Sequence, residues 1–379
     1  MSRRESLRFP YAIAVAVVIA AGALAGLGGA FPVLSLTQLI QDLALLLWCG
    51  VIVNASRTSA AMRTLLRTWC WSGLAWATFL VAAYVSGHQD LAGVSARVGA
   101  RASLTFGDPN LASSYFMLTL ILLWVAGCPV RRSLRWAATA LLLAAMVLTG
   151  SNGAFLSLLV GAGAGAIFWV YQRHGAPAAL AATCAYVLLA VAAASAVQLA
   201  DVQTLAENSG QPLLRDSLGR SDQSVAQRLT IFSEISDLHA QGTLLGWGPR
   251  ATKAVLQEEQ AAYPKEAHND YIASFVERGP LGSIGLLLLV ASLTWRMSRV
   301  LGRDAARQLS IAGLAPAPLL AAIVAVAVEA SNEQVLHFRH VWAIFAVIAA
   351  VSIWYCCRQP APPRREVQEL VTRPVPVHP

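Results

Sequence analysis

Residues 177–199 read PAALAATCAYVLLAVAAASAVQL, a stretch of 23 residues without a charged side chain. About 20 consecutive apolar residues are enough for an α-helix to cross the hydrocarbon core of a bilayer. The stretch is rich in Ala, Leu and Val and lacks the alternation of a membrane β-barrel strand. It therefore predicts a membrane-spanning helix. Nine further apolar runs occur, and the whole chain is 56% hydrophobic and only 13% charged.

The apolar runs together predict an all-α polytopic membrane protein of about ten transmembrane helices. We place the spans at 10–29, 34–53, 66–86, 110–128, 134–150, 152–172, 177–199, 280–297, 309–329 and 338–357. Arg3, Arg4 and Arg8 precede the first run, so a signal peptide is an alternative, but the length of the run favours a retained helix. We expect residues 1–357 to form a single transmembrane domain.

Basic residues are distributed unevenly between the two sets of loops. One set comprises the N-terminus, the C-terminal tail and the loops at 54–65, 129–133, 173–176 and 298–308. With its flanking residues this set holds 18 of the 28 Lys and Arg but only four of the 20 acids. Short basic loops remain in the cytoplasm. Both termini are therefore predicted to be cytoplasmic, and the net charge of +8 reflects topology rather than nucleic-acid binding.

The longest polar segment, 200–279, is predicted to be a large extracytoplasmic loop between spans 7 and 8. Apolar residues at helical spacing predict an amphipathic helix over 223–238, and a second helix is expected over 250–261. The Pro- and Arg-rich tail 358–379 is expected to be a disordered cytoplasmic segment. The six cysteines lie in or beside apolar runs and form no CxxC pair, so neither a disulfide framework nor a zinc site is indicated.

Polar residues gather at the predicted outer ends of the spans, where the head group of a lipid would lie. The candidates are Arg97, Arg101, Asn110, Arg228, His268, Asn269 and Arg339. An imidazole at this boundary can take a proton from a sugar hydroxyl, and a guanidinium binds phosphate oxygens through paired hydrogen bonds. Structural roles are the alternatives. These are a helix cap at Asn269 or Asp270, solvated loop charges for the arginines, and snorkelling for Arg339.

Asp42 lies inside the second span, where an acid is costly and marks either function or a hydrogen-bonded structural role. The outer loops contain no Asp-x-Asp pair and no His-x-x-x-His pair, so a divalent metal held by clustered side chains is not indicated. No phosphate-binding Gly-rich loop occurs either. We therefore expect neither a metal nor another cofactor.

Four stretches, in order, resemble the signatures of the O-antigen ligase and O-antigen polymerase superfamily of bacterial membrane glycosyltransferases. They are Thr105–Ala112, Leu148–Ala154, Arg228-Leu229 with Leu245–Gly248, and His268–Tyr271 with Glu277–Gly282. Within them, Asp108 replaces the leading Asn of the family's Asn-Pro-Asn, and Asn152 replaces the Arg of its Ser-Arg-Gly turn. Together these stretches fall within about residues 95–345.

The resemblance implies a GT-C-like fold and metal-independent transfer of a glycan from undecaprenyl diphosphate to an acceptor hydroxyl at the outer face of the membrane. It implies His268 and Arg228 as catalytic residues, with Arg101 and Arg339 near the diphosphate. The acceptor stays open: lipid A-core for a ligase, a repeat unit for a polymerase, or a protein hydroxyl. A solute transporter or lipid flippase is the main rival hypothesis, and an inactive scaffold is a third. One long outer loop bearing Arg and His favours an enzyme over both.

Overall fold

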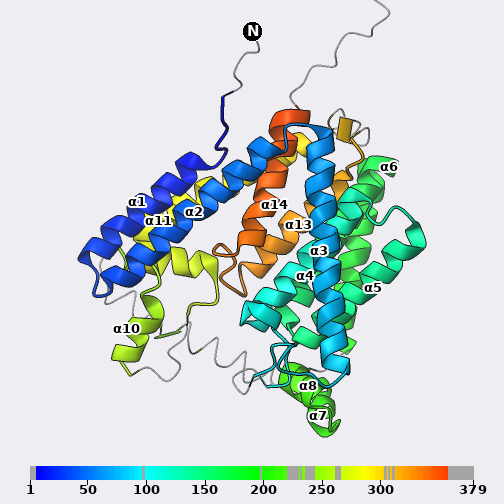
Figure 1. The fold of residues 1–379 in the computed structure, drawn as a ribbon, viewed down its shortest axis with the longest axis horizontal. Coiled ribbons are helices and arrows are strands. Elements are labelled where there is room, and N and C mark those ends of the chain that lie inside the picture. Colours follow the sequence, from blue (N-terminus) through cyan, green and yellow to red (C-terminus); the bar gives the residue numbers. More distant parts are fainter. Residues whose placement is uncertain are drawn as a thin grey trace, which may run out of the picture.

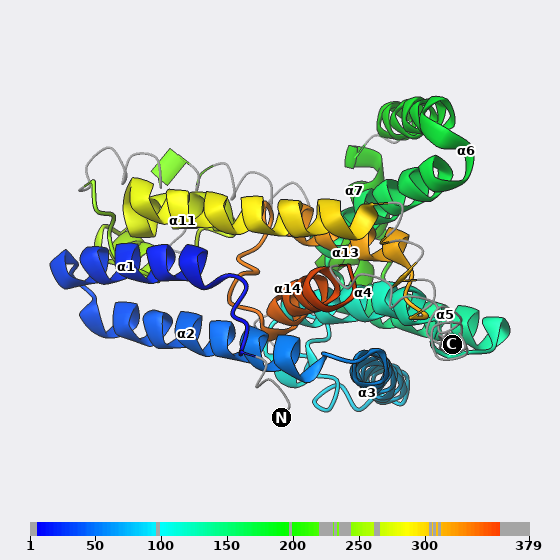
Figure 2. The ribbon, with the colours of Figure 1, turned by 90° about the horizontal axis from the view of Figure 1, so that it is seen from above.

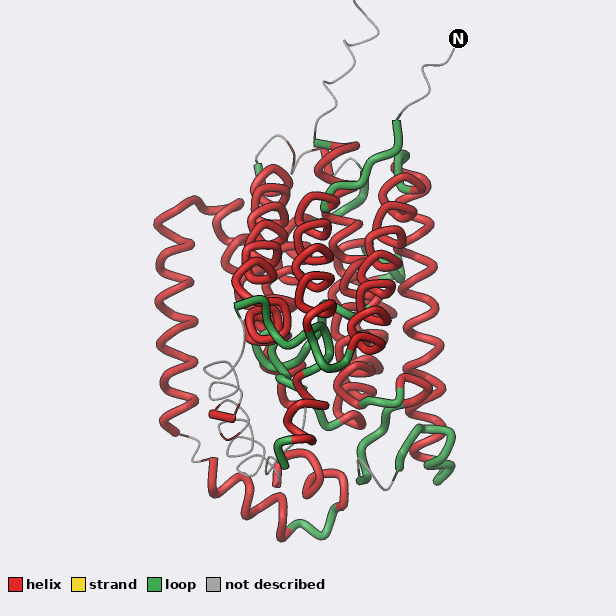
Figure 3. The backbone as a smooth tube through the Cα atoms, turned by 90° about the vertical axis from the view of Figure 1, so that its left-hand side faces the viewer, coloured by secondary structure: helices red, strands yellow, loops and turns green. Residues whose placement is uncertain are grey.

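The computed structural model describes residues 6–95, 99–196, 199–219, 230, 233–234, 244–260, 266–302, 305, 308–309 and 312–356. These residues form a bundle of helices, several of which are strongly inclined to one another, and no β-strand occurs among them (Figures 1 and 3). The predicted tail and most of the predicted helix 223–238 lie outside the described residues.

The long helices correspond to the predicted spans. The first five are α1 (Ala12–Gly28), α2 (Pro32–Ala55), α3 (Ser59–Val85), α4 (Pro109–Ala126) and α5 (Arg132–Thr149). The later ones are α6 (Asn152–Ala196), α11 (Asp270–Leu301), α13 (Pro316–Glu329) and α14 (Arg339–Ala350), which continues into η3 (Val351–Tyr355). In the described part of the chain, α2–α6 and α11 are long and apolar enough to cross a membrane, and α1, α13 and α14 with η3 are shorter apolar helices. The prediction of an all-α polytopic membrane protein is confirmed.

Short helical elements lie between the long helices in the chain. They are η1 (Leu104–Phe106), α7 (Leu199–Asn208), α8 (Pro212–Leu214), η2 (Arg215–Gly219) and α10 (Thr252–Glu258). Of these, α10 lies within the helix predicted over 250–261.

The α6 segment consists of two helices in space. Gly175 has φ 82° and ψ −175°, so the helical path breaks there, two residues before Pro177. The two arms fold back on each other (Figure 2). The hydroxyl of Tyr186 in the second arm donates to the carbonyl of Leu159 in the first at 3.2 Å. The arms match the predicted spans 152–172 and 177–199.

Two predicted boundaries are wrong. The third helix begins at Ser59 rather than 66, because the Thr58 side chain caps it by accepting from Ala61 N. Its basic residues thus lie on the first turns of the helix instead of in a loop. The ninth helix begins at Pro316 rather than 309, since Gly313 adopts φ 73° and Pro316 occupies the first turn. A proline is favourable there because its missing N–H is not needed.

The helices form two groups around a buried centre. Figure 2 shows α1, α2 and α11 side by side at one end, α3, α5 and α6 at the other, and α14 between them. The helices α4 and α14 are buried along most of their length. This centre brings the N-terminus of α4 close to the segment that joins α13 to α14.

Three of the segments predicted to share one side of the membrane lie together at one end of the bundle. Arg8 N donates to Asn54 Oδ1 at 3.1 Å, and Tyr355 Oη donates to Ser56 O at 3.0 Å. The short elements α7, α8 and α10 lie at the opposite end (Figure 1). Which end faces the cytoplasm stays a prediction from charge.

Candidate functional site

His268 lies immediately before α11, on the end of the bundle opposite the N-terminus. Its backbone has φ 45°, a left-handed conformation that non-glycine residues rarely adopt and that is common at functional sites. Its Nδ1 lies 2.9 Å from Oε1 of Glu333, and its side chain is 29% exposed. The ring is therefore fixed by a carboxylate and still reachable from outside.

Glu333 connects His268 to two further predicted residues. Asn110 Nδ2 donates to Glu333 Oε2 at 3.0 Å, and Arg101 Nη2 donates to Asn110 Oδ1 at 2.8 Å. The amide of Asn110 thus points its oxygen at a cation and its N–H at an anion. Four residues from three distant parts of the chain form one hydrogen-bonded series, which we call the relay (His268, Glu333, Asn110 and Arg101).

The sequence Asp108-Pro109-Asn110 explains how Asn110 reaches the relay. Asp108 caps α4 by accepting from Asn110 N at 2.6 Å, and Pro109 occupies the first turn. Both residues are favourable at these positions of a helix N-terminus. This cap leaves the Asn110 side chain directed at Arg101 and Glu333.

Arg101 is buried against the turn between α5 and α6. Its Nε donates to Thr149 O at 2.8 Å. Gly150 adopts φ 58°, and a Cβ there would lie 3.3 Å from Arg101 Cγ and 2.8 Å from Ser217 Cβ. Asn152 stands where the family that the sequence resembles has an arginine, and it donates to Ser217 O at 3.3 Å. This turn therefore shapes the wall behind the guanidinium.

The segment 330–338 between α13 and α14 is held by the residues that follow His268. Asp270 Oδ2 accepts from Val335 N at 2.8 Å and from Leu336 N at 3.1 Å. Asn269 Nδ2 donates to Ser331 O at 3.0 Å. Asn269 also caps α11, accepting from Tyr271 N and Ile272 N. The structural role considered for Asn269 is thus observed, and the same contacts place Glu333 opposite His268.

The stretch Leu245–Gly248 packs directly on the stretch Glu277–Gly282. Gly246 has φ 88°, and a Cβ there would lie 2.7 Å from Arg278 N. Gly279 has φ 62°, and a Cβ there would lie 2.3 Å from Leu244 O. Glu277 completes the junction by accepting from Arg250 N and from Thr252 Oγ1, both at 2.9 Å. Only glycine fits at these two positions, and the junction anchors the segment that leads to α10.

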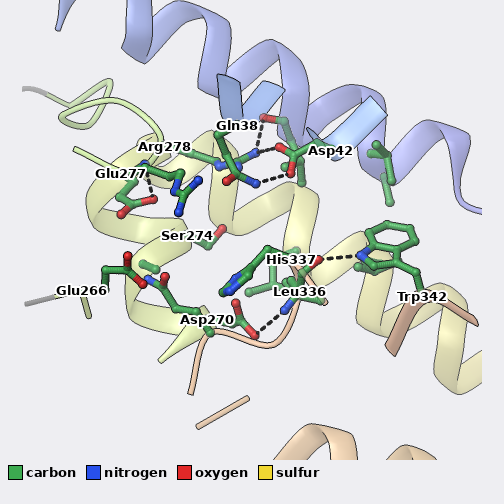
Figure 4. A pocket seen from close by; sticks show the side chains of 18 residues that line it. Gln38, Asp42, Glu266, Asp270, Ser274, Glu277, Arg278, Leu336, His337 and Trp342 are labelled. Atoms are coloured by element: carbon green, nitrogen blue, oxygen red, sulfur yellow. Dashed lines mark hydrogen bonds and ion pairs between the residues drawn. The ribbon is translucent and has the colours of Figure 1, made fainter. Parts of the chain in front are cut away.

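Asp42 forms a buried ion pair with Arg278. Arg278 Nη1 lies 2.7 Å from Asp42 Oδ2, and Gln38 Nε2 donates to Asp42 Oδ1 at 2.7 Å. The pair borders a polar cavity of about 90 Å³ between α1, α2, α11 and the segment 330–338 (Figure 4). Each member of a buried pair stabilises the charge of the other.

An apolar groove of about 360 Å³ runs between α11 and α13. It extends from Asp270 and Tyr271, next to His268, to Met297 and Leu301 near the far end of α11. Leucine, isoleucine and valine side chains line most of its length. The relay therefore lies close to one end of this apolar groove.

His337 is the titratable group of the segment 330–338 with a clear shift. Burial lowers its pKa below the ordinary value of 6.5, and the nearby carboxylates of Glu266 and Glu333 act in the opposite direction. The half-buried ring is thus favoured in its neutral form. Among the described residues, no group of three His, Cys, Asp or Glu is placed to hold a metal ion.

The structure brings together four of the predicted residues: His268, Asn269, Asn110 and Arg101. Arg97 and Arg228 lie outside the described residues. Arg339 begins α14 with an exposed side chain, and no other described residue forms a hydrogen bond or ion pair with its guanidinium. Glu333 was missed as an individual residue, because nothing in the sequence distinguishes it from the other polar residues before the last span.

Comparison with known proteins identifies one family. Residues 137–290 match the family model described as O-antigen ligase. This range runs from α5 into α11 and includes His268 and the junction of Gly246 with Gly279. No curated protein matches the chain.

Proposed function

We propose, from the match of residues 137–290 to the O-antigen ligase family model, that this chain transfers a glycan from undecaprenyl diphosphate to an acceptor hydroxyl. The observation that carries the proposal is the contact of His268 with Glu333. A carboxylate on one ring nitrogen fixes the tautomer and stabilises the imidazolium that forms when the other nitrogen takes a proton.

In the proposed reaction His268 Nε2 accepts the proton of the acceptor hydroxyl. The hydroxyl oxygen bonds to the anomeric carbon of the donor glycan, and the bond from that carbon to the diphosphate oxygen breaks. The electron pair of the broken bond stays on the diphosphate. Fixed positive charge offsets the charge that develops there. We assign this role to Arg228, with Arg101 holding Asn110 and adding its own charge at the site.

The apolar groove between α11 and α13 supports a lipid-borne donor. A polyprenyl tail needs a long hydrophobic surface, and the groove ends at Tyr271, three residues from His268. A tail bound there would bring its diphosphate to the relay. From the distribution of basic loops we place this end of the bundle on the periplasmic side of the inner membrane.

The test is glycan transfer by the purified full chain in detergent, with an undecaprenyl-diphosphate-linked glycan as donor. His268→Ala should reduce the rate by about 10²–10⁴-fold, the usual contribution of general base catalysis. His174→Ala, which changes an exposed histidine beside the bend of α6, is the matched control. Transfer by His268→Ala at the wild-type rate would refute the assignment.

The same assay separates the competing functions. A transporter or flippase requires two compartments and gives no transfer in detergent. Offering lipid A-core and free repeat units as competing acceptors distinguishes a ligase from a polymerase. Millimolar EDTA should leave the rate unchanged if arginines alone offset the charge, whereas a loss restored by Mg²⁺ would establish a metal requirement.

A further inference from the structure

The polar cavity beside the Asp42–Arg278 pair is separate from the relay but built on the same segments. Gln38 and Asp42 of α2, Ser274 and Arg278 of α11, and His337 line it (Figure 4). Two further lining residues are neighbours of the relay in sequence: Glu266 precedes His268 by two positions, and Gln334 follows Glu333. The cavity is therefore lined by the segments that carry the proposed base and its carboxylate.

The charges that line the cavity are balanced. Arg278 is already paired with Asp42 and also donates to Val18 O at 3.2 Å. Glu266 offsets Arg250, while the buried carboxyl groups of Asp270 and Glu277 already accept hydrogen bonds from Val335 N and Arg250 N. With no surplus of positive charge, the cavity suits an uncharged ligand better than a phosphate or a uronic acid.

Two polar groups in the lining lack partners within the described chain. The amide nitrogen of Gln334 is buried and has no hydrogen-bond partner. The carboxylate of Glu266 forms no hydrogen bond or ion pair with another described residue. An unpaired buried donor is costly and rare in native structures, so it points to a ligand. The cavity offers that ligand one donor and one acceptor.

The remaining surface suits a sugar ring. Trp342 and Leu336 form an apolar wall, and Trp342 is held by its Nε1 donating to Leu336 O at 2.6 Å. A sugar presents hydroxyls that both donate and accept, together with an apolar C–H face. The volume of about 90 Å³ is several times the roughly 10–15 Å³ that one water needs. That limits the occupant to about one ring.

We propose that this cavity binds one uncharged sugar ring of the acceptor glycan, with Gln334 and Glu266 as hydrogen-bonding partners. The assignment to the acceptor rests on the proposed function: the donor sugar carries a diphosphate, which this cavity has no surplus of positive charge to hold. Gln334 and Glu266 then determine which acceptor sugar is bound. His268 is the base that takes the proton from a hydroxyl of this ring or of the ring next to it.

The experiment measures sugar binding without requiring turnover. Saturation-transfer NMR is recorded on the full chain in a detergent whose head group is not a sugar, with glucose, galactose, mannose and N-acetylglucosamine as probes. We expect saturation transfer to at least one of the four. Gln334→Leu should weaken its binding by about five- to tenfold, the effect of one hydrogen bond. Glu266→Gln should weaken it too.

Gln257→Leu, which changes an exposed glutamine of α10, is the matched control and should bind like the wild type. Gln334→Leu removes an unpaired amide, so its thermal unfolding temperature should not fall, and a loss of binding cannot be ascribed to unfolding. Absence of binding to all four sugars, or equal binding by Gln334→Leu, would overturn the inference. Failure of glycan transfer with sugar binding intact would instead count against the proposed function.

Discussion

His268 Nδ1 and Glu333 Oε1 lie 2.9 Å apart although 65 positions separate the two residues in the chain. The contact joins the start of α11 to the segment between α13 and α14. With the proton on Nδ1 directed at the carboxylate, the lone pair of the neutral ring lies on Nε2. Glu333 is thus a positioning residue for the proposed base, and Asn110 holds its second oxygen in place.

Replacing Glu333 by Gln should lower kcat for glycan transfer by about 10²-fold while the donor KM changes little. The amide keeps the shape but cannot stabilise an imidazolium, and it permits the wrong tautomer. The pH–rate profile should also shift, which a merely structural role would not produce. Glu258→Gln, on the exposed face of α10, is the control. An unchanged kcat and pH profile would remove Glu333 from the mechanism.

Arg101→Lys should reduce kcat/KM by about tenfold, as the loss of one to two kcal/mol of hydrogen bonding predicts. The guanidinium donates to Thr149 O and Asn110 Oδ1 at once, and an ammonium group cannot reproduce this planar geometry. Arg131→Lys, exposed before α5 at the other end of the bundle, provides the comparison. Equal kinetics for the two variants would show that the relay does not need Arg101.

Gly279→Ala should lower the thermal unfolding temperature in detergent by several degrees, corresponding to about 2–4 kcal/mol. The residue adopts φ 62°, and its new Cβ would lie 2.3 Å from Leu244 O. The matched change Gly28→Ala meets nothing within 4 Å and should be nearly neutral. If both variants melt like the wild type, the packing of Gly246 on Gly279 does not contribute as argued.

Acidification should destabilise the protein through His337. Burial lowers the pKa of this imidazole below 6.5, so below about pH 6.5 the unfolded chain binds a proton that the folded protein resists. Its stability contribution is complete above the unfolded pKa and is lost as pH falls toward the folded one. His337→Gln should therefore flatten the dependence of the unfolding temperature on pH between about 7.5 and 5. His88→Gln, in an exposed turn, should leave that dependence unchanged.

The membrane helices could be predicted because the requirement for apolar length acts on each segment separately. The membrane-spanning helix over residues 177–199 could be predicted from its own sequence, without reference to the segments that pack against it. Helix ends were less predictable, since they depend on local caps such as Thr58 and turns such as Gly313 rather than on hydropathy. The N-terminus, the loop 54–65 and the end of η3 could be grouped because crossing the membrane an even number of times returns the chain to one end.

The candidate site was predictable only in part. His268, Asn110 and Arg101 fall within or beside short motifs of a recognisable family, and the structure brings them together. Glu333 could not be selected, because its role depends on a contact between α11 and the segment before α14. The same holds for Asp42: its place inside a span predicted a special role, but its partner Arg278 is distant in sequence and only packing identifies it.

The bonds of Asn269 and Asp270 to Ser331, Val335 and Leu336 make the spacing of the base and its carboxylate a local property. Bilayers of different thickness change the tilt of transmembrane helices. Such tilting alters the width of the apolar groove between α11 and α13, while His268 and Glu333 move together as one unit. Lipid composition should consequently govern how readily a long-chain substrate enters, and leave the geometry of proton transfer unchanged.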